Sequence, residues 1–249
     1  MLSNPKVLLK AAKQLLLEST FSKSQYIELD KCLVSFTFDD VPVSAVTHGA
    51  KILEDNNVRG TYYVASGINP DGSSFLAPEH MYQLADAGHE IGCHTFHHTN
   101  LRWASGAATI ADCSQNTQAI QKILPEYAIK NFAYPFGSVG PRSKRVLRNL
   151  YTSMRTSDEG LNVGKTDLSH LRAVSLYSET FSREHILNIL EQAIQKKAWL
   201  VFYTHDVADD HGPWGTSIDD FQWVVDQCAN RQCEILRVDA ALKKIGADS

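Results

Sequence analysis

Cysteine patterns that would mark a disulfide framework or a zinc ribbon are lacking in this sequence of 249 residues. Its five cysteines are odd in number, scattered and without a C-x-x-C pair, at positions Cys32, Cys93, Cys113, Cys228 and Cys233. Free cysteines of this kind behave as small apolar residues in protein cores. We therefore expect reduced thiols and a cytoplasmic location.

Long hydrophobic runs are lacking as well. No apolar stretch reaches the roughly 18 residues that a membrane-spanning helix needs. Near the amino terminus, Lys6, Lys10 and Lys13 interrupt the apolar run that a secretory signal requires. We therefore expect neither secretion nor a membrane span. Leucines recur at helical spacing among these lysines, so residues 1–30 are expected to form an N-terminal helical extension. This extension is expected either to pack on the domain or to lie on a membrane surface.

The sequence also lacks an excess of positive charge. The net charge is −4 and the sequence pI is near 6.2, which leaves no basic surface for nucleic acid. The chain also lacks a G-x-S-x-G nucleophile elbow, internal repeats and an interdomain linker. With 43% hydrophobic residues it can bury a substantial core, so we expect one domain over residues 1–249 and no nucleic-acid partner.

Short β-rich runs alternate with segments of helical period from residue 31 onward. This alternation is typical of parallel strands joined by right-handed crossover helices. Strands are expected at residues 32–38, 60–64, 89–93, 131–134, 152–156, 173–177, 200–203 and 233–238. Helices are expected at residues 43–56, 78–87, 107–124, 141–150, 182–197 and 218–229. The chain is therefore expected to have an α/β fold.

Two adjacent carboxylates, Asp39 and Asp40, follow the run VSFTF directly, where a buried strand ends and its loop begins. Catalytic groups of β/α barrels collect at this rim. Two neighbouring charges repel each other, and a cation at the strand mouth would compensate them. The pair indicates either such a cation site or a solvated turn before Pro42.

A histidine cluster, HTFHH at residues 94–98, follows another strand-like run. If the segment turns helically, His94 and His98 lie on one face because they are four residues apart. Two imidazoles and a carboxylate suit zinc and leave a fourth position for water. A zinc metalloprotease would need Glu after the first histidine, where this chain has Thr95. The alternatives are His97 in place of His98, or a run of loop histidines.

A third candidate, His205, closes the last strongly hydrophobic strand, in VFYTHDV. Histidine titrates near neutrality and serves as a general acid in many enzymes, although a single histidine at a strand end is more often structural. Because the carboxyl ends of parallel strands meet at one rim, Asp39, the histidine cluster and His205 are expected to converge there.

The sequence resembles the polysaccharide deacetylase family, the NodB-homology carbohydrate esterases. The resemblance is carried by FTFDD at 36–40, HTFHH at 94–98, FAYPFG at 132–137 and FYTHD at 202–206, which stand in the family's order. It implies a distorted (β/α) barrel of about seven parallel strands. It also implies a divalent metal, foremost Zn²⁺, with Co²⁺, Fe²⁺, Ni²⁺ and Mn²⁺ as alternatives.

The resemblance further implies a role for each matching residue. Asp39 is the expected base and His205 the expected acid. Metal ligands are expected at Asp40, His94 and His98, with Thr95 bracing their loop. The expected substrate and oxyanion contacts in the third motif are Tyr134, Pro135 and Phe136. Outside the matching motifs, Trp214 in the loop after the last strand is expected to form an apolar floor for a sugar ring with Tyr134 and Phe136, against the alternative of ordinary loop packing.

Two departures from the family pattern concern the residues that tune catalysis. Ala133 stands where the family's motif R-x-P-Y-G has the arginine that orients the base. Arg172, just before the run AVSLY, is our candidate replacement, against the alternative of a surface salt bridge. The family's D-x-x-D-W segment, which supplies a carboxylate partner for the acid, is also missing.

The expected function is removal of an N-acyl group from an amino sugar or oligosaccharide, in surface-polysaccharide biosynthesis. Two alternatives remain at this point. One is a metal-dependent hydrolase of a non-sugar amide, because fold and metal site do not determine the substrate. The other is a carbohydrate-binding protein without activity, which the two departures favour.

Overall fold

The computed structural model describes residues 20–68 and 76–247. The helix predicted from the leucines near the amino terminus lies outside these residues. Within residues 20–30 the structure has strand β1, Ser24–Ile27, so the predicted helical extension does not continue to residue 30. Strand β1 pairs antiparallel with β7, Gly164–Asp167, in a small second sheet that the sequence did not predict.

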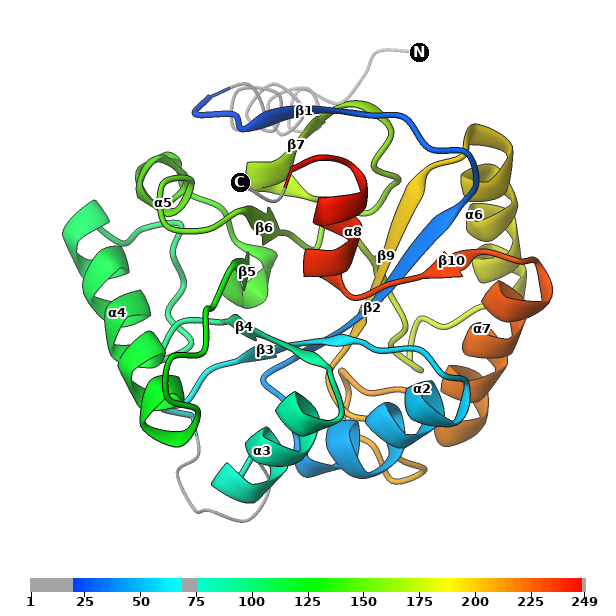
Figure 1. Ribbon diagram of the computed structural model, residues 1–249, viewed down its shortest axis with the longest axis horizontal. Coiled ribbons are helices and arrows are strands. Elements are labelled where there is room, and N and C mark those ends of the chain that lie inside the picture. The colour runs from blue at the N-terminus through cyan, green and yellow to red at the C-terminus, as the bar shows by residue number, and fades with distance from the viewer. Residues whose placement is uncertain (1–19, 69–75, 248–249) are drawn as a thin grey trace.

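The main sheet is parallel and has the strand order β6-β5-β4-β3-β2-β9-β8 (Figure 1). Its seven strands curl into an incomplete barrel, as the resemblance implied. Their bounds are β2 Leu33–Asp39, β3 Thr61–Val64, β4 Glu90–Cys93, β5 Asn131–Ala133, β6 Ser153–Arg155, β8 Val174–Ser175 and β9 Trp199–Thr204. A short strand, β10 (Glu234–Ile235), pairs with the first residues of β2. All eight strands lie within the ranges expected from the sequence or one residue beyond them.

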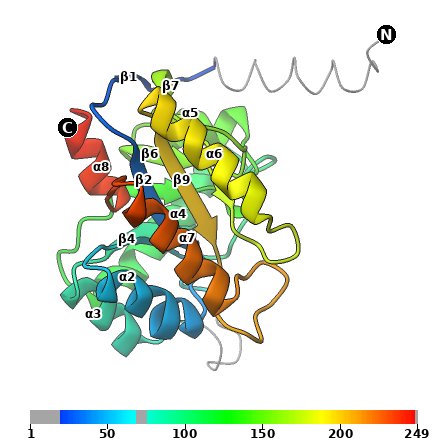
Figure 2. The ribbon, with the colours of Figure 1, turned by 90° about the vertical axis from the view of Figure 1, so that its right-hand side faces the viewer.

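Helices cover the outside of the curled sheet (Figure 1). They are a π-helical turn at Ala45–Ala50 and helices α2 Lys51–Asp55, α3 Pro78–Asp86, α4 Gly106–Ile123, α5 Pro141–Leu147, α6 Arg183–Lys196 and α7 Ile218–Asn230. Serine side chains at the starts of α4, α6 and α7 accept a backbone N–H bond, which stabilises each helix end. In Figure 2, α6 and α7 lie side by side next to β9.

A final helix, α8 (Val238–Lys244), was not predicted. It begins inside the expected strand at 233–238, so β10 ends three residues early. The backbone N–H of Val238 donates to Thr61 and that of Asp239 to Glu90. Helix α8 therefore lies across the end of the sheet at which β3 and β4 begin.

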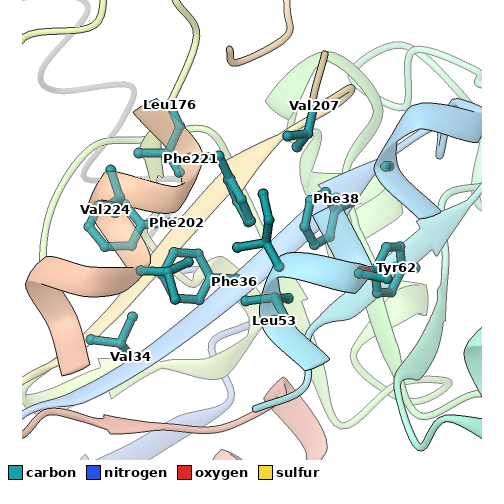
Figure 3. Close-up of a cluster of buried hydrophobic side chains, with 14 of the residues drawn as sticks. Val34, Phe36, Phe38, Leu53, Tyr62, Leu176, Phe202, Val207, Phe221 and Val224 are labelled. Carbon is teal, nitrogen blue, oxygen red and sulfur yellow. The ribbon is translucent and has the colours of Figure 1, made fainter. Parts of the chain in front are cut away.

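The central strand β2 is buried over all seven of its residues, as expected for an apolar run covered on both faces. Phe36 and Phe38 enter an aromatic core between the sheet and its helices (Figure 3). There Phe38 stacks on Tyr62 with ring centroids 4.5 Å apart, and Phe36 stacks on Phe202 at 5.6 Å. This packing anchors the strand that ends in Asp39. Among the described residues, no helix is both long and apolar enough to cross a membrane.

Candidate active site

Asp39 and Asp40 lie where β2 leaves the sheet. Asp39 is the last residue of the strand and is 4% exposed. In an extended strand, successive side chains would point to opposite faces. Here Asp40 and Val41 adopt left-handed conformations, with φ of 60° and 61°, which cost non-glycine residues of order 1–3 kcal/mol each. The turn brings both carboxylates to the same rim.

Asp40, His94 and His98 form a compact cluster whose ligand atoms all lie within 4.8 Å of one another. Asp40 Oδ1 lies 3.7 Å from His94 Nε2 and 3.5 Å from His98 Nε2. It is buried and accepts no hydrogen bond from any described residue. A tetrahedral ion with bonds of about 2.1 Å spaces its ligands roughly 3.4 Å apart. The separations and the unsatisfied oxygen therefore fit a divalent cation held by the three predicted ligands.

The two imidazoles of this cluster are in the neutral form that binds metals. His94 Nδ1 lies 2.8 Å from the carbonyl oxygen of Ala133, to which it donates, so the lone pair of Nε2 faces Asp40. Burial lowers the pKa of His94 to about 3. Burial also lowers the pKa of His98. Both rings are therefore available as ligands over the neutral pH range.

The histidine loop reaches this arrangement without forming a helix, contrary to the conditional expectation from its spacing. Thr95 and His98 both have positive φ, 61° and 52°. The hydroxyl of Thr95 accepts the N–H of Thr99 at 3.1 Å and so closes the turn that carries His98. This is the position expected of a brace for the loop.

A carboxylate on α4, Asp112, holds the other side of the histidine loop. Its Oδ1 accepts the backbone N–H groups of Phe96 and His97, at 3.2 and 3.1 Å. The same oxygen lies 2.8 Å from His97 Nδ1. His97 thus points away from the cluster, with a side chain that is 60% exposed. The structure places His98, not His97, beside Asp40.

A buried arginine, Arg155, pairs with Asp39. It is the last residue of β6, is 1% exposed, and its Nη2 donates to Asp39 Oδ1. The rings of Tyr63 and Tyr203 flank the guanidinium, with centroids 5.5 and 4.8 Å from its central carbon. Burial alone would raise the pKa of Asp39, but the charge of Arg155 and its hydrogen bond hold it below its ordinary value. Asp39 is therefore an anion at neutral pH.

Our expectation that Arg172 orients Asp39 is wrong. Arg172 lies before the start of β8, whereas the rim is formed by strand ends. Its Nη1 donates to the backbone carbonyl of Glu159 at 3.2 Å. Its side chain lines a separate cavity, together with Asn162 and Asp167. Arg155 occupies the place beside Asp39 because its strand ends, rather than begins, at the rim.

His205 follows β9 and reaches the same rim. Its Nε2 lies 3.7 Å from Asp40 Oδ2. Its Nδ1 is buried without a hydrogen-bond partner among the described residues, and burial lowers its pKa. The adjacent Asp206 points into its own loop, where its Oδ2 accepts the N–H of Gly212 at 2.8 Å. Asp206 therefore does not replace the carboxylate partner of the missing D-x-x-D-W segment.

A cavity of about 410 Å³ opens over these groups. Its lining includes the catalytic candidates Asp39, Asp40, Arg155 and His205 and the aromatic side chains Phe136, Tyr177, Tyr203 and Trp214. Phe136 is 65% exposed and Trp214 57% exposed. The ring of Phe136 packs against His98, with centroids 4.3 Å apart. The acid–base candidates and a metal ligand thus line this cavity together with exposed aromatic side chains.

Two of the expected substrate contacts lie elsewhere. Tyr134 is fully buried, packs its ring against Phe132 and donates its hydroxyl to the carbonyl of Ser169 at 3.3 Å. Pro135 is also buried and begins a short 3-10 turn, Pro135–Gly137. Within this turn Phe136 has a φ of 59° and faces solvent. Tyr134 and Pro135 therefore support the turn, and the cavity is lined by Phe136.

The sequence reasoning missed Arg155, Asp112, Tyr177 and Tyr203. Of these, Arg155 left a signal: it lies inside the run 152–156, which we expected to be a strand of the parallel sheet. A charge in a buried strand needs a partner, and the two aspartates at another strand end were available. Asp112, a helical acid, and the two tyrosines have no comparable signal.

Comparison with known proteins yields one family and several solved structures with a similar fold. The sequence pattern of the family described as "Polysaccharide deacetylase" matches residues 27–155. A chitin deacetylase from Colletotrichum lindemuthianum is 26% identical over 152 residues, which cover 59% of this chain and 60% of that protein. The chain thus matches about three fifths of the length of this curated relative.

Two solved structures have the same fold. A family 4 acetyl xylan esterase from Clostridium thermocellum, in complex with a cobalt ion, has a TM-score of 0.63 and 17% identity, and covers 86% of this chain and 92% of its own. A family 4 pseudoenzyme from Bacillus anthracis has a TM-score of 0.62 and 13% identity, and covers 86% of this chain and 66% of its own. At these identities the likeness concerns the fold.

Proposed function

Because the chain belongs to the polysaccharide deacetylase family, we propose that it is a metal-dependent hydrolase that removes an N-acetyl group from an amino sugar. The observation that carries the proposal is the cluster of Asp40, His94 and His98 with the anion of Asp39 beside it. The likeness to a chitin deacetylase supports the amino sugar as substrate class.

The proposed chemistry divides the work between the cation and the side chains around it. A bound divalent cation supplies Lewis acidity, which polarises the acetamide carbonyl and makes water a stronger nucleophile near neutral pH. Asp39, an anion held by Arg155, takes the proton of the attacking water. His205, whose Nε2 lies 3.7 Å from Asp40 Oδ2 in the same cavity, donates a proton to the departing amine.

The rest of the cavity binds and orients the sugar. The backbone N–H of Phe136, in the left-handed turn after β5, is the proposed donor to the oxyanion; one such donor contributes about 3 kcal/mol in well-studied hydrolases. The exposed rings of Phe136 and Trp214 offer apolar faces for a pyranose ring. Zn²⁺ is the proposed metal, because two neutral imidazoles and one carboxylate suit it.

We place the substrate in the assembly of a surface polysaccharide, acted on in the cytoplasm. This setting rests on the few and scattered cysteines and on analogy within the family. Contact of the amino-terminal segment with a membrane surface belongs to the same proposal.

The test measures bound metal and acetate release in the same preparations. Metal-loaded wild type is expected to release acetate from N-acetylated chitooligosaccharides and not from simple acetamides. D39N is expected to keep its metal and lose at least about a thousandfold in kcat, since it removes the base. H94A and H98A should lose metal, while the matched control H97A keeps it because His97 faces Asp112.

Each outcome has a distinct meaning. Release from simple amides alone would replace the sugar with another amide substrate. A wild type that holds stoichiometric metal and releases no acetate from any of these compounds would indicate a carbohydrate-binding pseudoenzyme. Full metal content in both H94A and H98A would overturn the ligand assignment.

A further inference from the structure

Two carboxylates on consecutive residues face one group of imidazoles. Asp40 lies within 3.7 Å of the Nε2 atoms of all three histidines. The charge of Asp39 also acts on the same three rings. Only Asp40 forms a compact group of ligand atoms with His94 and His98 in the structure. Asp39 is its neighbour in the chain and a second carboxylate at the same rim, so something must hold it apart from a cation bound there.

Arg155 distinguishes the two aspartates. Its guanidinium donates to Asp39 Oδ1 through Nη2 and to the carbonyl of Thr156 through Nη1, at 3.3 Å. The rings of Tyr63 and Tyr203 flank it, and it is 1% exposed. A planar guanidinium held in this way presents fixed donor directions. Asp39 therefore has a rigid cationic partner at the end of β6, whereas Oδ1 of Asp40 accepts no hydrogen bond from the described residues.

We propose that Arg155 is a positioning residue that keeps Asp39 off the cation and leaves Asp40 as the sole carboxylate ligand. Without Arg155, Asp39 would be a buried anion without a positively charged partner. Binding to the doubly charged ion nearby would then balance its charge. A second carboxylate would then fill the coordination position that a catalytic site keeps open for water and substrate. The movement of Asp39 onto the cation would also take it away from the position in which it acts as the base.

The register of the sheet explains how an arginine reaches this place. Arg155 pairs with Ala133 across β5 and β6, so the two residues stand at the same level of neighbouring parallel strands. Ala133 is the position at which the family motif carries its arginine, and its carbonyl holds the ring of His94. A guanidinium from β6 therefore starts at the level of the sheet at which the family motif has its own.

The experiment reads the coordination of Co²⁺ by its visible absorption in wild type, R155Q, D39N and D39N/R155Q. Wild type and D39N are expected to give the same spectrum, because Asp39 is not a ligand. R155Q is expected to give a different spectrum, because a carboxylate would take the position that water holds in wild type. D39N/R155Q should return to the wild-type spectrum, since the intruding carboxylate is gone. R172Q is the matched control and should leave the spectrum unchanged.

Turnover provides the second readout and rests on the proposed function. R155Q is expected to lower kcat about a hundredfold with KM within about twofold, because misplacing a reacting group by about 1 Å has effects of this size. In the D39N background the same substitution should lower kcat no further. R155K retains the charge and should fold even where R155Q does not, and its spectrum should lie between those of wild type and R155Q.

The two readouts separate the failure of this inference from failure of the proposed function. An unchanged Co²⁺ spectrum in folded R155Q and R155K, or a further loss of kcat in D39N/R155Q relative to D39N, would overturn the role of Arg155. A wild type without deacetylase activity, in which R155Q still changes the spectrum and D39N/R155Q restores it, would refute the function and leave the role of Arg155 standing.

Discussion

The carboxyl of Asp40 gives the metal-free protein a defined pH dependence. Burial and the neighbouring charge of Asp39 raise the pKa of Asp40 to about 7, against about 3.9 in an unfolded chain. The folded protein therefore holds a proton that the unfolded chain has lost. The stability that this proton contributes is complete below pH 4 and is lost as the pH rises to about 7. The full loss amounts to about 4 kcal/mol.

D40N is therefore expected to stabilise the metal-free protein, and to do so more at pH 8 than at pH 5. The amide mimics the protonated carboxyl and does not titrate, so the difference between the two pH values should be roughly 2 to 3 kcal/mol. Urea unfolding in the presence of a chelator measures it. D55N, at an exposed carboxylate on α2, is the control and should show no such trend. Saturating Zn²⁺ should reverse the order of stability, because it binds wild type and not D40N.

The residues of the site differ in how far the sequence could reveal them. Asp39, Asp40, His94 and His98 were predicted because their chemistry is concentrated in short runs at strand ends. The partner of Asp39 was not, because it comes from a strand more than a hundred residues away and the choice between Arg155 and Arg172 depends on strand direction. Only the fold tells which end of a strand meets the rim.

At the scale of elements, the 3-10 turn Pro135–Gly137 joins β5 to the cavity. Gly137 has a φ of 60°, and a Cβ added there would overlap the side chain and backbone N of Ser157. Ser157 lines the cavity two residues beyond Arg155. The turn can therefore keep Phe136 over His98 only with glycine at its end.

G137A is expected to lower the free energy of unfolding by at least 2 kcal/mol more than G164A, and to lower kcat at least tenfold. Gly164 has nearly the same φ, 61°, but no atom lies within 4 Å of a Cβ added there. Both variants have the strain of a left-handed residue, about 1–2 kcal/mol, and G137A alone has the clash. Urea unfolding measures the loss of stability in each variant, and steady-state kinetics measures the loss of kcat. Equal losses in both variants would show that the contact with Ser157 is unimportant.

The secondary structure was predictable where it is long or strongly patterned. Strand β2 is a continuous apolar run, and α4, α6 and α7 have helical period and serine caps. The pair β1 and β7 was missed because its strands have four residues each and only one buried residue apiece, so they lack a hydrophobic pattern. The loop of His94 to His98 departs from its helical spacing because Asp112 on α4 binds its backbone.

At the scale of the whole molecule, the two ends of the curled sheet carry different groups of polar residues. The candidate active site lies at the carboxyl ends of the strands. A buried polar network lies at the opposite end, around Glu90, the first residue of β4. Glu90 accepts bonds from Thr61 at 2.8 Å, Asn131 at 2.6 Å and the backbone N–H of Asp239 at 2.9 Å. It thus joins the starts of β3, β4 and β5 to helix α8.

E90A is expected to lower the free energy of unfolding by about 3 kcal/mol or more and to leave kcat within twofold of wild type. The substitution leaves two buried donors, Thr61 and Asn131, and the partly buried N–H of Asp239 without their acceptor. Each unsatisfied buried donor costs about 1–3 kcal/mol, and every group at the rim is conserved. Groups at the amino ends of barrel strands serve stability rather than chemistry. Thermal unfolding and acetate release at a temperature where both proteins are folded provide the measurements. E191A, at an exposed carboxylate of α6, should change neither. A fall in kcat of tenfold or more in folded E90A would show instead that the polar network transmits its geometry through β4 to His94.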